Sequence, residues 1–315
     1  MLFNLELAKK HFFKWLKGII FLTLVSSVFY ATKEIWGDFG YYMGKVDVSS
    51  FLLISFLFIL NQTINGYMIK QYISVFEVKL DFVEWFGLVW VQSFGNLLPM
   101  SAGLLSNAAY LKVKRQVGTS KFISYVIGDT VVKFLVLGSI SIVIIVYEFL
   151  IGGEFQKTVL VFTFLILFVG LLAVFFPSLK SNNKIFNWFV KIQLGWLDIK
   201  KNKQVLAFSF LSQIAALFLI GLQTYIVFNL LGVNLPFSLV LLITIFTSII
   251  RIASIFPGNL GLRESISGYF TLAFNLTFSI GVLASMIQRV VTMFWIFLFG
   301  ITFSIYFFKK SKLIN

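Results

Sequence analysis

Residues 205–231 read VLAFSFLSQIAALFLIGLQTYIVFNLL, and none of these 27 residues carries a charge. A helix rises about 1.5 Å per residue, so about 20 apolar residues cross the roughly 30 Å hydrocarbon core of a bilayer. A helix also satisfies its own peptide groups, which lipid cannot do. The stretch therefore predicts a transmembrane helix.

Apolar runs of the same kind recur along the whole chain. They predict helices at 16–32, 51–69, 122–147, 159–176, 205–231, 237–256 and 281–308, with further segments at membrane depth at 85–105 and 264–280. We therefore expect an all-α integral membrane protein with about six to eight transmembrane helices and one or two re-entrant segments. Residues 1–315 would form a single polytopic domain.

The composition excludes a sizeable soluble domain. The chain is 59% hydrophobic and 12% charged, with a mean hydropathy of +0.95, whereas soluble domains are about 25% charged. The net charge of +14 comes from lysines in short segments between apolar runs, not from one basic face. We expect no nucleic-acid partner; the lysines fit cytoplasmic loops beside anionic lipids.

Residues that support catalysis or metal binding are scarce. The chain has no Cys, and its one histidine, His11, precedes the first apolar run. Thiolate and imidazole metal sites, a Cys nucleophile and a buried His base are therefore not expected. No Gly-x-x-x-x-Gly-Lys-Ser/Thr phosphate loop occurs, and no loop has room for a catalytic domain. The sequence predicts neither a cofactor nor an enzyme.

The loop charges predict the topology. Segments 33–50, 148–158 and 231–236 are poor in Lys and Arg, whereas 106–121 and 177–204 are rich in Lys. The positive-inside rule then places both termini in the cytoplasm. The Lys-rich start resembles a signal peptide but is interpreted as a retained first helix. The Lys-rich, Phe-rich and Arg-poor composition is typical of proteins from AT-rich bacterial genomes, so we expect a bacterial inner membrane.

Two segments carry helix-breaking residues at membrane depth. The first reads SFGNLLPMSAG, from Ser93 to Gly103, and the second reads SIFPGNLGLRE, from Ser254 to Glu264. Both contain Pro-x-x-x-Gly-Leu, which interrupts a helix because Pro lacks a backbone donor and Gly is conformationally free. Broken backbone is tolerated in a membrane where protein or a water-filled cavity satisfies it, so both breaks indicate a site. The motif residues are Pro99 and Gly103 in the first segment, and Pro257, Gly258 and Gly261 in the second.

The spacing of the two motifs is about half the chain, as two repeats would give. The repeat halves would be about 16–147 and 205–308. Segment 177–204, which carries Trp188 and Trp196, would join them along the cytoplasmic interface. Segment 85–105 is expected to be re-entrant, because both of its flanks are assigned to the cytoplasm. The pattern leaves open whether 237–280 crosses twice or forms a second re-entrant hairpin.

Three of the four arginines, Arg251, Arg263 and Arg289, fall in or beside apolar segments of the second half. A charge there costs at least about 2.5–3.5 kcal/mol unless it is paired or hydrated. A guanidinium fork matches phosphate geometry, so these residues are candidates for binding a lipid head group. The alternative is that each pairs with a carbonyl or an acid for packing.

Asp129 and Glu264 are the two acids expected within membrane-embedded sequence. Asp129 and Lys133 are four residues apart and can meet on one helix face. Glu264 cannot face its neighbour Arg263, so Arg289 or Lys133 would be its partner. These groups form either a head-group or proton-sensitive network or a structural set of ion pairs. Asn96, beside Pro99, is either a cavity residue or a helix cap.

The two motifs resemble the flippase-like transmembrane domain of lysylphosphatidylglycerol synthases and its stand-alone relatives, over most of the chain. The more specific likeness is Pro257, Gly258, Gly261, Arg263 and Glu264, which match the family's Pro-Gly-x-x-Gly-hydrophobic-Arg-Glu pattern; Arg289 matches its late intramembrane Arg. The first half departs from the family, with Met100-Ser101 where Gly-Arg is frequent and Leu104 where an acid is frequent.

The resemblance implies translocation between leaflets of a lipid with a charged or glycosylated head group, such as a phospholipid or a polyprenyl-phosphate-linked lipid. The partners would be anionic or phosphate-bearing membrane lipids. The main alternative is a non-transporting accessory subunit that docks a membrane-associated glycosyltransferase or a polymer exporter through 177–204. A membrane-embedded transferase and a small-solute transporter are further alternatives, and the sequence gives no oligomeric state.

Overall fold

The computed structural model describes residues 35–98, 102–152, 157–175, 194, 196–253 and 257–312, and this part consists of helices joined by turns and short loops. Its longer elements are α3 (Val48–Ser74), α6 (Thr119–Leu150), α7 (Lys157–Phe175), α9 (Lys203–Leu230) and α12 (Phe278–Lys312). The shorter ones are α2 (Ile35–Gly44), α4 (Phe82–Gly95), α5 (Ala102–Arg115), α10 (Phe237–Ala253), the 3-10 turn η1 (Pro257–Asn259) and α11 (Leu262–Ala273).

Four helices in the described ranges are long and apolar enough to cross a membrane, namely α3, α6, α9 and α12. They confirm the expected helices at 51–69, 122–147, 205–231 and 281–308. Helix α7 confirms the segment at 159–176. The expected helix at 16–32 and most of the segment 177–204 lie outside the described residues. The chain is thus an all-α, multi-pass membrane protein.

The first break lies where the Pro-Gly motif predicts it. Helix α4 ends at Gly95, α5 begins at Ala102, and the two helices pack together as an antiparallel pair. Each has 14 residues and so rises about 21 Å, which is too short to cross the hydrocarbon core alone. The segment 85–105 therefore enters the fold and returns, as one arm of a helical hairpin and the start of the other.

The second break makes a second hairpin from α10 and α11. Phe246 of α10 stacks on Phe270 of α11, with ring centroids 3.9 Å apart. Near the turn, the Asn259 side chain bonds the Ile250 carbonyl. Helix α11 has 12 residues and rises about 18 Å, so this region is a second short hairpin and not two full crossings. The expected segment 264–280 is in fact α11 followed by a turn and the start of α12.

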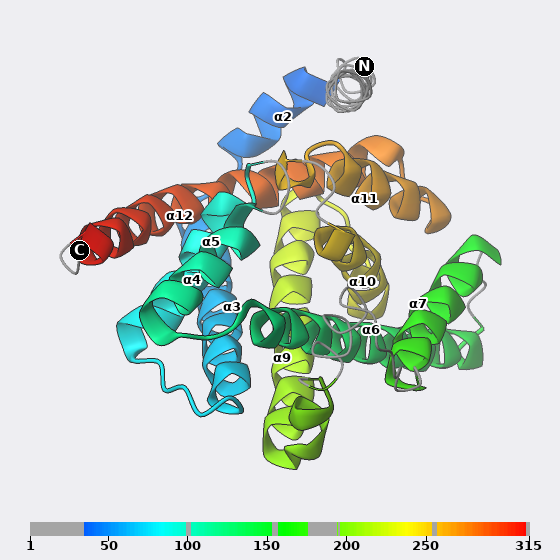
Figure 1. Ribbon diagram of the computed structural model, residues 1–315. Helices are drawn as coiled ribbons and strands as arrows, with labels where there is room; N and C mark the ends of the chain where they lie inside the picture. The colour runs from blue at the N-terminus through cyan, green and yellow to red at the C-terminus, as the bar shows by residue number, and fades with distance from the viewer. Residues whose placement is uncertain are drawn as a thin grey trace, which may run out of the picture.

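The same order of elements occurs twice. A long helix, a short hairpin and a second long helix follow one another as α3, α4–α5 and α6, and again as α9, α10–α11 and α12. Each hairpin packs against the last helix of the other half, α4 on α12 and α10 on α6. Two repeats would produce this order and this exchange of contacts. Helix α9 lies near the middle of the helical bundle and packs on α3, α6, α10 and α12 (Figure 1).

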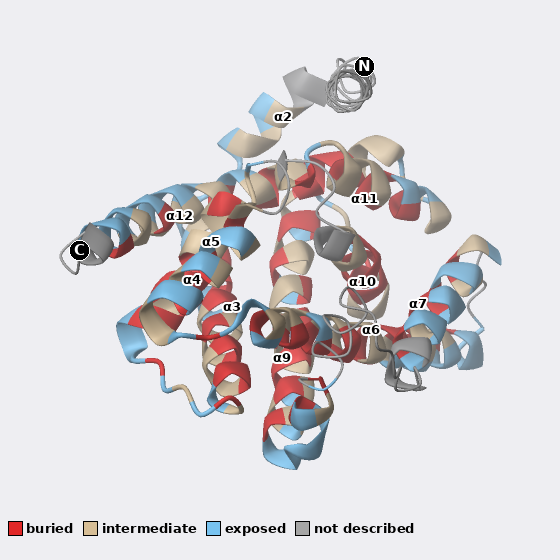
Figure 2. Ribbon diagram, viewed as in Figure 1, coloured by how far each residue is buried: buried red, intermediate tan, exposed pale blue. Residues whose placement is uncertain are grey.

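The buried residues form two apolar clusters, one centred on α9, α10 and α12 and one on α3, α4 and the start of α6. Outward faces remain apolar: Phe164 and Phe168 of α7, for example, are exposed. Figure 2 shows pale blue, exposed stretches along α7. This pattern fits a lipid-facing surface, because lipid tails are as apolar as the core.

Two segments expected to be loops contain helix. Residues 35–44 of the expected outer loop 33–50 form α2, which packs on α12. In the expected basic loop 106–121, helix α5 continues to Arg115, so Lys112, Lys114 and Arg115 belong to its last turn. Basic side chains are favourable there because they complement the negative end of the helix dipole.

Candidate functional site

The tips of the two hairpins meet. The backbone N–H of Gly258, in the second tip, donates a hydrogen bond of 2.9 Å to the carbonyl of Asn96, which ends helix α4 in the first. Leu97 packs against Gly258 at the same point. The two breaks that the sequence shows as separate motifs therefore form one structural feature.

Glycine permits the backbone of the second tip. Gly258 and Gly261 have φ values of 56° and 81°, in the left-handed region where a side chain is strained. Asn259 lies between them with φ 51°, a conformation that Asn tolerates better than most residues. Glu264 accepts a hydrogen bond of 2.9 Å from the Gly261 N–H and so caps the start of α11. The motif thus fixes a tight turn and the helix that follows it.

Arg289 holds this tip from helix α12. Its Nε lies 2.8 Å from Oε1 of Glu264, and both side chains are largely buried. Its Nη1 and Nη2 donate to the carbonyls of Gly258 and Asn259, at 3.0 and 3.4 Å. Of the two partners considered for Glu264, Arg289 is the one it contacts. The pair binds the backbone of the tip, which is the packing role left open for these residues.

A cavity of about 390 Å³ lies beside the two tips. Both halves of the chain and both apolar clusters contribute to its wall. Its lining is rich in polar side chains, most of them amides: Asn61, Gln62, Asn65, Gln92, Ser93, Asn96, Asp129, Thr130, Lys133, Gln213, Gln223, Ser248, Asn259, Arg263, Gln288 and Thr292. A polar cavity inside an apolar helical bundle can solvate a charged group that lipid would exclude.

Arg263 lines this cavity and begins a chain of hydrogen bonds. Its Nη2 donates to Oε1 of Gln288 on α12. Gln288 Nε2 in turn donates to Oε1 of Gln223 on α9, at 3.3 Å. Arg263 therefore faces the cavity, whereas Arg289 lies against the tip backbone. The side chain of Arg251, like residues 99–101 with Pro99, lies outside the described residues.

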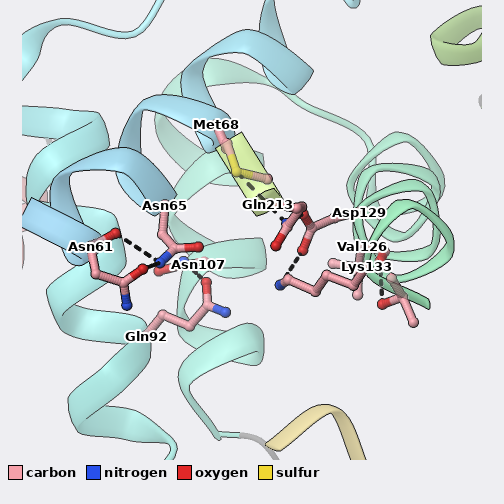
Figure 3. A network of polar contacts seen from close by, with 10 residues as sticks. Asn61, Asn65, Met68, Gln92, Asn107, Val126, Asp129, Lys133 and Gln213 are labelled. Carbon is pink, nitrogen blue, oxygen red and sulfur yellow. Dashed lines mark hydrogen bonds and ion pairs between the residues drawn. The ribbon is translucent and has the colours of Figure 1, made fainter. Parts of the chain in front are cut away.

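Asp129 forms a second polar group on the cavity wall. Its Oδ2 lies 2.6 Å from Nζ of Lys133, which confirms the contact predicted from their spacing. Its Oδ1 accepts a 2.8 Å hydrogen bond from Nε2 of Gln213, which also lies 3.7 Å from the Met68 sulfur. Figure 3 shows Gln213 pointing toward Asp129, which it joins to the α3 side of the cavity.

Amide side chains join the two arms of the first hairpin to each other and to α3. Asn107 Nδ2 donates to Gln92 Oε1 across the two arms at 2.9 Å (Figure 3). Gln62 Nε2, on α3, donates to the Ser93 hydroxyl at 2.7 Å. The arms lie so close at Gly103 that an added Cβ would be 2.0 Å from the Gln92 carbonyl oxygen. The second Gly of the two motifs thus has different roles: close approach in the first and positive φ in the second.

Sequence reasoning missed a buried acid at the base of this hairpin. Glu84, expected outside the embedded sequence, is only 2% exposed. Arg115 binds it in a bidentate way, with Nε 2.8 Å from Oε1 and Nη2 2.5 Å from Oε2, and the Tyr110 hydroxyl donates to Oε1 at 2.9 Å. Asp81 and Glu84 also form a capping box at the start of α4. The spacing Asp81-x-x-Glu84 is the signal that could have revealed it.

Glu148, expected in an outer loop, is a second buried acid that was missed. It is 7% exposed near the end of α6 and accepts a hydrogen bond from the Ser238 hydroxyl in the first turn of α10. No local pattern marks this contact, because the two residues are distant in sequence.

The comparisons with known proteins agree with this architecture. The model of a protein family described as "Lysylphosphatidylglycerol synthase TM region" matches residues 14–300. The match covers both hairpins, both Pro-Gly motifs and every residue of the cavity wall. No curated protein matches the chain.

Proposed function

The chain belongs to the lysylphosphatidylglycerol synthase TM region family, and from this premise we propose that it moves a lipid with a charged or glycosylated head group between leaflets. The family links the chain to membrane lipids. The transport step and the head group are our inference from the cavity. We propose a transport protein and not an enzyme, and membrane lipids that bear phosphate as its partners.

The observation that carries the proposal is the polar cavity beside the joined hairpin tips. A lipid head group that crosses a bilayer needs a polar environment at membrane depth, because an unsolvated charge costs several kcal/mol there. Broken helices supply such an environment in other membrane transport proteins, through their free backbone groups and the polar side chains beside them. About a dozen uncharged polar side chains supplement them here.

The charges on the wall favour an anionic head group. Asp129 and Lys133 neutralise each other, and Arg263, which donates to the neutral side chain of Gln288, adds a positive charge to the lining. The described lining therefore has a net positive charge. Guanidinium groups bind phosphate oxygens strongly, so a phosphate-bearing lipid fits this wall.

The same reasoning extends to the location. We propose a bacterial inner membrane with both termini in the cytoplasm, from the loop charges. The first hairpin then inserts from the cytoplasmic side and the second from the outer side. The two hairpins would reach the cavity from opposite leaflets, a geometry suited to alternating access.

The experiment that tests transport measures leaflet-to-leaflet movement of fluorescent anionic and zwitterionic phospholipids in proteoliposomes. Wild-type protein is compared with Arg263→Ala and with Lys112→Ala, which removes the same charge from an exposed position outside the cavity. We expect wild type and Lys112→Ala to move anionic lipid and Arg263→Ala to lose most of this activity. Each variant must first match wild type in its thermal unfolding.

If wild-type vesicles behave like empty liposomes with every head group, transport of phospholipids is excluded. The alternative, an accessory subunit that docks a glycosyltransferase or an exporter through 177–204, would then be pursued. Most of that segment lies outside the described residues, so the cavity is the stronger basis for a proposal.

A further inference from the structure

Three cavity-lining residues each have a buried polar atom without a hydrogen-bond partner in the described part of the chain. They are Oδ1 of Asn96, at the end of α4, Nε2 of Gln223, on α9, and Oδ1 of Asn259, in the second hairpin tip. Gln223 and Asn259, which are 1% and 7% exposed, are the two whose amide orientation is fixed by their neighbours. An unsatisfied buried polar atom costs about 1–3 kcal/mol, so native structures leave few without a purpose.

The neighbours of Gln223 determine which of its ends is free. Arg263 can only donate, so the atom it contacts on Gln288 is the oxygen and the other end of Gln288 is an NH₂ group. That NH₂ donates to Gln223, which fixes the oxygen of Gln223 at this contact. The unpartnered end of Gln223 is therefore an N–H donor, on a residue that lines the same cavity as Arg263.

The orientation of Asn259 is fixed in the same way. One end of its amide contacts the carbonyl oxygen of Ile250 at 3.0 Å, and a carbonyl can only accept, so this end is the NH₂ group. The free end is an oxygen, which can only accept. Asn259 lies four residues before Arg263, on the same tip. Residues of the cavity wall thus supply a cation, a donor and an acceptor.

We propose that the ligand is a phosphate-type anion that brings its own hydroxyl donor, with Gln223 and Arg263 bonding its anionic oxygens and Asn259 accepting from the hydroxyl. This inference rests on the proposed head-group site and specifies which chemical groups that site binds. The donor is a neutral hydroxyl and not an ammonium, because the Arg263 guanidinium would repel a second cation. A hydroxylated phosphodiester head group and free hydrogen phosphate share this chemistry.

The first test compares two short-chain lipids of equal charge. Phosphatidylglycerol carries hydroxyls beyond its phosphate, and phosphatidylmethanol carries none. Both are titrated calorimetrically into the detergent-solubilised full chain. We expect phosphatidylglycerol to bind about tenfold more tightly, because phosphatidylmethanol leaves the Asn259 oxygen unsatisfied. Equal affinities would overturn recognition of a lipid hydroxyl while leaving an anionic head-group site in place.

A matched pair of variants assigns the preference to Asn259. Asn259→Gly removes the acceptor and keeps a residue that adopts positive φ, so the affinity ratio between the two lipids should fall to about one. Asn275→Gly makes the same change at another Asn with positive φ, which is exposed and outside the cavity. It should retain the wild-type ratio. If Asn259→Gly kept the wild-type affinity ratio, Asn259 would not be the residue that binds the hydroxyl.

The donor is tested with Gln223→Glu, which keeps an oxygen for Gln288 and replaces the free N–H donor with an acceptor. Affinity for both lipids should fall by about tenfold or more. Gln92→Glu places the same charge on the same cavity at an amide whose oxygen already accepts from Asn107. A larger loss in Gln92→Glu than in Gln223→Glu would contradict the assignment.

Inorganic anions separate the two possible sources of the ligand. Hydrogen phosphate carries a proton donor at neutral pH and sulfate carries none. If phosphate binds, sulfate does not, and the two lipids bind equally, the hydroxyl donor is that of a free phosphate: the donor is upheld, and a lipid head group as its source is overturned. If neither anion nor either lipid binds, the proposed function fails together with this inference.

Discussion

The amide of Gly258 and the carbonyl of Asn96 form a 2.9 Å hydrogen bond that joins the tips of two helical hairpins from opposite halves of the chain. Backbone groups in a membrane interior must find partners within the protein, since lipid offers none. The break in each hairpin frees such groups, and here one break satisfies the other. If the two hairpins moved apart, both backbone groups would need new hydrogen-bond partners.

Because the two tips are in contact, a disulfide engineered between them should form. The natural chain has no cysteine that could compete. A Cβ added at Gly258 lies 3.8 Å from Cα of Leu97, within reach of disulfide geometry. Leu97→Cys/Gly258→Cys should therefore cross-link on mild oxidation, seen as a shift in electrophoretic mobility that reductant reverses. Leu98→Cys/Gly258→Cys is the control, because the Leu98 side chain is exposed. Equal cross-linking of both pairs would indicate that the tips are not held in this register.

Gly103→Ala should open the first hairpin. The added Cβ would meet the Gln92 carbonyl oxygen at 2.0 Å, so the arms must separate, at a cost of about 1–3 kcal/mol. The midpoint of thermal unfolding in detergent should fall accordingly. Gly118→Ala meets nothing within 4 Å and has a negative φ, so it should unfold like wild type. A Gly103→Ala variant as stable as that control would show that the arms are not in close contact.

The Glu264–Arg289 pair should be strongly coupled in a double-mutant cycle. Replacing one member of a buried ion pair leaves the other charge uncompensated and costs about 3–5 kcal/mol. Glu264→Gln, Arg289→Met and the double variant should give a coupling of at least about 1 kcal/mol in unfolding free energy. The same cycle on Glu264 and Lys133, which contacts Asp129 instead, should give a coupling near zero. The reverse result would assign Glu264 to Lys133.

Arg115→Lys should destabilise the base of the first hairpin although it preserves charge. Lysine cannot reproduce the bidentate bond to Glu84, whose side chain is buried. We expect the free energy of unfolding, measured in mixed micelles, to fall by about 1–2 kcal/mol. This is less than the cost of breaking a fully buried ion pair, because Arg115 is partly exposed. Lys112→Arg, the opposite exchange on the exposed side of the same helix, should have no measurable effect.

The topology can be tested with single cysteines, because the natural chain contains none. Lys79→Cys and Thr119→Cys lie on either side of the first hairpin and should be modified by a membrane-impermeant thiol reagent from the same side of the membrane. Gly44→Cys, before α3, should react only from the other side. Reaction of Lys79→Cys and Thr119→Cys from opposite sides would mean that α4 and α5 together cross the membrane.

The sequence by itself determined the class of fold and the position of both breaks. The length of an apolar run can be read from consecutive residues, so α3, α6, α9 and α12 could be located from the sequence alone. The Pro-Gly motifs are local in the same sense, because they act on the backbone of a few residues. The Asp129–Lys133 contact followed from helix periodicity.

Only the tertiary structure decided which distant groups meet. It placed Arg263 on the cavity and Arg289 behind the tip, although both are arginines in apolar surroundings. It also joined Asn96 to Gly258 and left Gln223 and Asn259 each with an unsatisfied atom. These relationships depend on how helices far apart in sequence pack. In lipid, close contacts and hydrogen bonds between helices determine that packing, and hydrophobicity does not distinguish one partner from another.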